Sequence, residues 1–65
     1  MDVKAKMAEL GMSNVDMLLA LRNRGIEVQP PFLSNALRQI DTTPKAQKIL
    51  SECEEIIWEK EHELV

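Results

Sequence analysis

Residues 24–40 read RGIEVQPPFLSNALRQI. Two adjacent prolines, Pro30 and Pro31, stand directly before a run whose apolar residues recur at helical spacing: Leu33, Ala36, Leu37 and Ile40. Proline is tolerated in the first turn of a helix, because its missing N–H would have no partner there. The stretch therefore predicts a short helix that begins sharply at Pro30, reaches about Ile40 and turns its apolar side toward a core.

The opposite side of this predicted helix carries residue types that read DNA bases. Asn and Gln pair with adenine, and Arg pairs with guanine, when a helix lies in the major groove. The candidate base-reading residues are Gln29, Pro31, Phe32, Asn35, Arg38 and Gln39. A solvated polar face is the other interpretation. For Phe32 two roles stay open, contact with a thymine methyl group or closure of the core beside Val28.

Two further helices are expected before this one. Val3, Met7 and Leu10 form one stripe over about Asp2 to Leu10, and Gly11 ends it. Ser13, with Asp16 three residues later, resembles a capping box that opens a second helix, which Gly25 ends.

The second helix is apolar nearly all round, with Val15, Leu18, Leu19 and Leu21. We therefore expect it to be central, with Leu18 buried against Leu33 and Leu37 where the two helices cross.

A fourth helix should follow a polar break, with Thr43 as its cap, Pro44 at its first position and an end near Glu63. At ~1.5 Å per residue it would be about 30 Å long, roughly twice the length of each other helix. Its second half then needs another partner, and we expect a homodimer. The candidate dimer residues are Ile56, Ile57, Trp58 and Leu64.

Composition excludes several classes of protein. The 65 residues make a single all-α domain of four helices, since β-branched residues never alternate over a strand's length. Cys53 and His62 are the only residues of their kinds, so neither a disulfide framework nor a metal site is expected, and no catalytic constellation appears. We expect no enzyme, no cofactor, no membrane span and a cytoplasmic location.

Charge is unevenly distributed along the chain. The net charge is −3, but residues 1–50 carry seven basic and five acidic side chains, whereas residues 51–65 carry one lysine and six glutamates. The acidity therefore belongs to the tail. The candidate phosphate contacts are Arg22, Arg24, Lys45 and Lys48. Complementation of the helix dipole and solubility are the alternative roles of these four cations.

Two stretches resemble one known family. LGMSNVDMLLAL (10–21) and QPPFLSNAL (29–37) look like the helix junction and the recognition helix of Cro/phage-repressor (XRE-type) helix-turn-helix domains. The resemblance implies a small regulator from a bacterium or its prophage that binds double-stranded DNA. Residues 1–50 would be the DNA-binding core, residues 51–65 an acidic extension of the last helix, and the helix over about 30–40 would enter the major groove.

A second hypothesis comes from another class of protein. The acidic last helix and Trp58 would be the working surface of a protein-interaction module, such as an antirepressor or a phage-encoded modulator, and the first three helices its scaffold. The two hypotheses differ in the salt dependence of binding to arbitrary duplex DNA.

Overall fold

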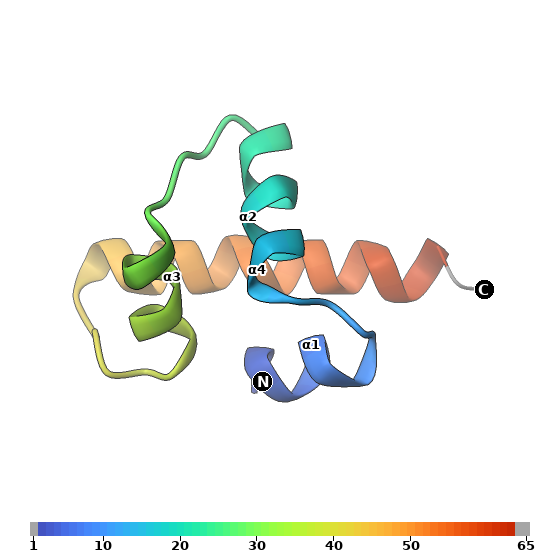
Figure 1. Cartoon of the computed structure of the whole chain (residues 1–65), viewed down its shortest axis with the longest axis horizontal. Coiled ribbons are helices and arrows are strands. Elements are labelled where there is room, and N and C mark those ends of the chain that lie inside the picture. Colours follow the sequence, from blue (N-terminus) through green and yellow to red (C-terminus); the bar gives the residue numbers. More distant parts are fainter. Residues whose placement is uncertain (1, 64–65) are drawn as a thin grey trace.

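The computed structural model describes residues 2–63, which form four helices. They are α1 (Val3–Glu9), α2 (Asn14–Asn23), α3 (Pro30–Leu37) and α4 (Pro44–Glu63). Figure 1 shows α4 running the length of the molecule, with the three shorter helices on one side of it. The all-helical fold with a long C-terminal helix is thus confirmed. No helix of the described range has both the length and the apolarity needed to cross a bilayer.

Side-chain caps fix the helix starts. The Ser13 hydroxyl accepts from the Asp16 N–H at 3.1 Å, and the Asp16 carboxylate accepts from the Ser13 N–H at 2.9 Å, so the capping box is confirmed. The Thr43 hydroxyl accepts from the Ala46 N–H at 3.3 Å at the start of α4. The two prolines occupy the first two positions of α3, as expected, and Gln29 before them makes no side-chain cap.

The three short helices all end in a Schellman motif, in which the residue after the C-cap takes a left-handed conformation. Gly11 (φ 69) and Gly25 (φ 81) do so after α1 and α2. After α3 the same position holds Gln39 (φ 59), whose N–H donates to the Ala36 carbonyl, while the Ile40 N–H donates to that of Asn35. The expected end near Ile40 is therefore wrong.

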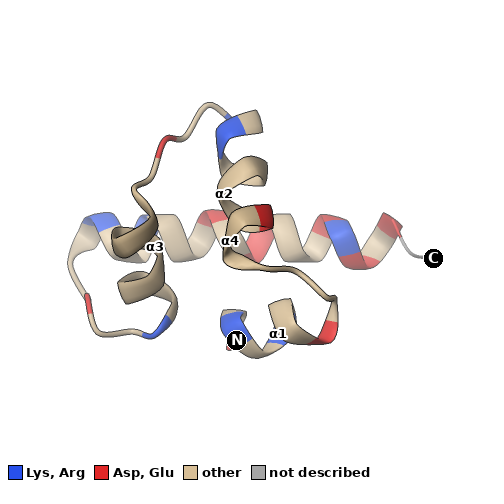
Figure 2. Ribbon diagram, viewed as in Figure 1, with Lys and Arg blue, Asp and Glu red and all other residues tan. Residues whose placement is uncertain are grey.

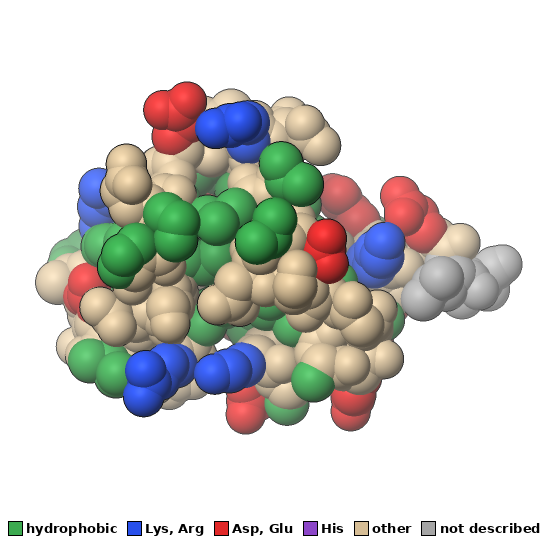
Figure 3. All heavy atoms as spheres, in the orientation of Figure 1, with side chains coloured by type: hydrophobic (Ala, Val, Ile, Leu, Met, Phe, Trp, Pro, Cys, Tyr) green, Lys and Arg blue, Asp and Glu red, His purple; other side chains and the backbone are tan. Residues whose placement is uncertain are grey.

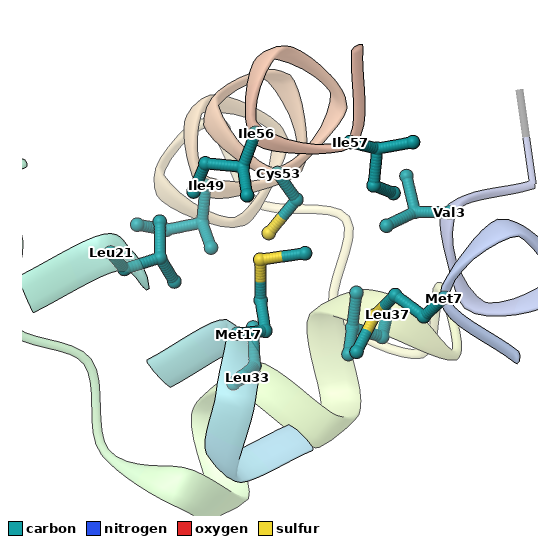
Figure 4. Close-up of a cluster of buried hydrophobic side chains, with 10 residues drawn as sticks. All are labelled: Val3, Met7, Met17, Leu21, Leu33, Leu37, Ile49, Cys53, Ile56 and Ile57. Atoms are coloured by element: carbon teal, nitrogen blue, oxygen red, sulfur yellow. The ribbon is translucent and has the colours of Figure 1, made fainter. Parts of the chain in front are cut away.

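The core lies between α4 and the other three helices. Five large side chains in it have no exposed surface, and Figure 4 shows them meeting from α2, α3 and α4: Met17, Leu21, Leu33, Cys53 and Ile57. The expected burial of Leu33 and Leu37 is confirmed. Leu18 is only half-buried, because Met17 and Leu21 hold the inner positions of α2 instead.

Two expectations for α2 and α3 are contradicted. Helix α2 is not buried all round: Val15 is 62% exposed and Leu19 53% exposed. Both lie on its outer side, four residues apart, whereas Met17 and Leu21 fill its inner side. Ile40 is 62% exposed as well, because the left-handed turn at Gln39 carries the chain away from the inner face of α3.

The expected apolar seam for a second copy on α4 is also absent. Ile56 is 7% exposed and Ile57 is fully buried, because α1 packs against the C-terminal half of α4. In Figure 4 Val3 of α1 lies beside Ile57. These two isoleucines are core residues of a single chain. Leu64, the last residue of the expected seam, lies outside the described residues.

Candidate nucleic-acid interface

The outward side of α3 presents Pro31 and Asn35, and Arg38 continues the same line one turn later. All three are exposed, whereas Leu33 and Ala36 point into the core. Gln29, just before the helix, is exposed, and its amide is not used as a cap. One edge of the molecule therefore gathers side chains that can donate and accept hydrogen bonds with a base edge.

Arg38 and Gln39 lie in the turn after α3 rather than on the helix. Arg38 is the C-cap residue, and Gln39 is the left-handed residue that follows. Both are exposed, so they stay within reach of a ligand that contacts Asn35. The recognition element is correspondingly shorter than expected, covering residues 30–37 as helix and residues 38–39 as turn.

Phe32 lies at the edge of this surface and packs against the core, half-buried. The Nζ of Lys45 sits 5.1 Å from the centre of its ring, a cation–π contact that joins the start of α4 to α3. Of the two roles left open for Phe32, closure of the core agrees with this packing. Lys45 remains exposed, as does Lys48 one turn further along α4.

Arg24 does not belong to the interface. Its guanidinium contacts the carboxylates of Glu52, Glu55 and Glu59 at 3.1, 2.5 and 3.2 Å. Three carboxylates more than neutralise one cation, so the expected phosphate contact by Arg24 is wrong. The contact instead ties the C-terminal end of α2 to α4. A sequence signal for it existed: the three glutamates are spaced by three and four residues and form one stripe on a helix.

Arg22 remains exposed and forms no ion pair within the described residues. In the same range, ion pairs involve only two cations, Arg24 and Lys6, the latter with Glu9 at 3.5 Å and with Glu61 at 3.4 Å. Four of the six tail glutamates thus face a cation of their own chain. Figure 2 shows basic positions in the turn after α3 and at the start of α4, acidic positions in the connections before and after α3, and the acidic positions of α4 in its middle and C-terminal part.

Trp58, 58% exposed, is the large apolar side chain that remains on the outer side of α4 within the described range. Its ring stacks on that of His62, with 3.8 Å between centroids, and a ring nitrogen of His62 lies 2.7 Å from the Trp58 carbonyl oxygen. Of the four expected dimer residues, only Trp58 is thus exposed among those the structure describes.

An apolar groove lies next to the candidate interface, and sequence reasoning missed it. It has a volume of about 640 Å³, and we call it the α2/α3 groove. Its apolar lining comes from α2, the connection after it and α3: Val15, Leu18, Leu19, Ile26, Val28 and Phe32. Figure 3 shows hydrophobic side chains gathered across this face of the molecule. Arg22, Glu27 and Lys45 lie at its edge.

Neither the thiol nor the acidic groups make a reactive site in residues 2–63. Burial raises the pKa of the Cys53 thiol to about 11, so it stays protonated and unreactive at neutral pH. No three His, Cys, Asp or Glu side chains of the described range are grouped in a way that would hold a metal ion.

Comparisons with known proteins give no relative from which a function could be inferred. No family model, no curated protein and no solved structure matches the chain.

Proposed function

We propose that the protein is a sequence-specific DNA-binding transcriptional regulator in which α3 enters the major groove. The observation that carries the proposal is the exposed row of Asn35 and Arg38, with Gln29 at the start of α3. Lys45 and Lys48 at the start of α4 are exposed too and have no carboxylate partner within residues 2–63. The acidic positions of α4 lie in its middle and C-terminal part. The resemblance to Cro-type domains implies the same role for α3.

The dimensions of α3 suit this role. An α-helix with its side chains is about 10–12 Å in diameter, and the eight residues of α3 give it a length of about 12 Å. The major groove is about 12 Å wide and admits one helix. Asn35 can pair with adenine and Arg38 with guanine, each bidentately, and Gln29 and Gln39 can reach neighbouring base edges.

Phosphate contact falls to Arg22, Lys45 and Lys48. They are exposed and have no carboxylate partner within residues 2–63. The net charge of −3 should repel DNA only weakly from α3. Four of the tail glutamates form ion pairs with Arg24 or Lys6 and are partly neutralised there. A palindromic operator would take two copies, one on each half-site.

A selection of binding sites from random duplexes tests the proposal. We expect one enriched sequence and an affinity that falls with salt, with a slope of about −2.7 for three phosphate contacts. Asn35→Ala should cost about 1–3 kcal/mol at one base pair and relax the choice of base there. Lys48→Ala should weaken binding to all duplexes equally. Gln47 is a neutral, exposed neighbour on α4, so Gln47→Ala should change neither the affinity nor the base preference. Absence of any enriched sequence would contradict the proposal.

The exposed Trp58 favours a second candidate, a protein-interaction module that works through the outer side of α4. A tryptophan 58% exposed among glutamates suits an interface anchor. Because the chain has no other tryptophan, its fluorescence reports on this surface alone. If the random-duplex selection fails, a partner that shifts the Trp58 emission to shorter wavelength would support this candidate.

A further inference from the structure

We infer that the α2/α3 groove is a docking surface for a second copy of this chain, which pairs with the first about a two-fold axis. The inference does not depend on DNA binding. It starts from Val15 and Leu19, two large apolar side chains that are more than half exposed on adjacent turns of α2. The other apolar lining residues are half-buried and pack against the core, so apolar surface continues from the core to the solvent-exposed groove: Leu18, Ile26, Val28 and Phe32.

A chain of 65 residues has reason to cover such a surface. Domains of about 60 residues bury only ~60% of their unfolded surface and are marginally stable alone. The stripe on α4 that was expected to recruit a second copy is already used inside the chain by Ile56 and Ile57. Among the described residues, the groove is therefore the main apolar surface still available for pairing.

The charges at the edge of the groove indicate which partner it accepts. Arg22 and Lys45 are positive, and Glu27 is negative. Because both signs are present, the edge does not select a partner of one charge sign alone. A surface that carries both signs can instead complement a copy of itself, because a two-fold contact places one surface patch against the same patch.

The specific pairing follows from Arg22 and Glu27. Both line the groove, Arg22 near the end of α2 and Glu27 in the connection to α3. Neither forms an ion pair within residues 2–63. Rotation by a half turn about an axis between them places each Arg22 against Glu27 of the other copy, while Leu19 meets the apolar lining across the axis.

The experiment is sedimentation of the full chain from micromolar to millimolar concentration, without DNA. A contact as small as this groove provides gives weak association, so we expect dimers only toward the upper end of that range. Leu19→Lys should abolish them. Ile40→Lys is the matched control and should sediment like the parent, because Ile40 is 62% exposed, against 53% for Leu19, but lies outside the groove.

Charge reversal tests the two-fold arrangement itself. Arg22→Glu alone and Glu27→Arg alone should each be monomeric, because like charges then face each other. An equimolar mixture of the two variants should dimerise again, since every pair across the axis is then of opposite sign. Circular dichroism of each variant confirms that the helices are retained.

Three results would overturn the inference. They are a parent chain that is monomeric throughout, dimers that survive Leu19→Lys, or a mixture of Arg22→Glu and Glu27→Arg that stays monomeric although the parent dimerises. If dimers that survive Leu19→Lys are lost with Trp58→Ala, pairing belongs to the outer side of α4. Since none of these measurements contains DNA, they are separate from the duplex selection that tests the proposed function.

Discussion

Replacement of Gln39 by glycine should make the fold more stable. Gln39 has φ 59 at a position that glycine fills after α1 and α2. A side chain in the left-handed conformation costs about 1–2 kcal/mol. Glycine at this position would remove that cost, but it also raises the entropy of the unfolded chain, which lowers the stability by about 0.4–1 kcal/mol. The free energy of unfolding should therefore rise by about 0.5–1 kcal/mol.

Thermal unfolding followed by circular dichroism measures the change. For a domain of this size 1 kcal/mol corresponds to about 4–8 °C in Tm, so Gln39→Gly should melt several degrees above the parent. Gly25→Ala is the control with the opposite sign. Its φ is 81 and an added Cβ would meet nothing within 4 Å, so its cost is conformational alone.

A Gln39→Gly variant that melts at or below the parent, while Gly25→Ala melts lower, would refute the reasoning. It would mean that the Gln39 side chain stabilises the turn by more than its backbone conformation costs. If Gln39 also contacts a base, the same variant should bind its operator less tightly despite its higher Tm. Such opposition between stability and binding is typical of strained residues at functional sites.

Four further outcomes are expected. Leu33→Ala should lower the free energy of unfolding by ~2–5 kcal/mol, whereas Leu19→Ala on the exposed side of α2 should change it little; urea titration compares them. Arg24→Ala should lower Tm, and salt should reduce the difference, because ion pairs with Glu52, Glu55 and Glu59 are lost. The N–H and hydroxyl of Ser13 hold the pKa of Asp16 below its ordinary value of 3.8. The ionised Asp16 therefore stabilises α2 above pH 3.8, and this contribution is lost as the pH falls through the lowered pKa. Asp16→Asn should make the stability depend less steeply on pH in that acidic range. Cys53 should react with a thiol reagent only as fast as the whole domain opens, because it is buried and its pKa is raised to about 11; hydrogen exchange gives the opening rate for comparison.

Helix starts could be predicted from sequence because their signals are local. Ser13 with Asp16, Thr43 with Pro44, and the two prolines of α3 each satisfy or remove backbone donors within one turn. Glycine marked the ends of α1 and α2 for a similar reason. The end of α3 was missed because Gln39 is not a residue that usually adopts positive φ, and nothing local announces it.

Burial was harder to predict, since periodicity tells which residues share a face but not what covers that face. Ile56 and Ile57 looked like a free seam because the three shorter helices appeared too short to cover the second half of α4, yet α1 packs there. Val15 and Leu19 looked like core because α2 is apolar nearly all round, which left no evident outer side. Arg24 looked like a phosphate ligand because its partners lie 28 to 35 residues away along the chain.

The two proposals place different demands on the same side chains. Arg22 and Lys45 are proposed phosphate contacts, and both also lie at the edge of the α2/α3 groove. A cation held against Glu27 of a second copy is not free to meet a phosphate, so pairing through the groove and binding to DNA oppose each other at these positions. Reciprocity of linked equilibria then requires that DNA weaken pairing by the same factor by which pairing weakens DNA binding. Because pairing through so small a groove is weak and phosphate attraction is strong at low salt, duplex DNA should draw the chain out of its paired form rather than the reverse.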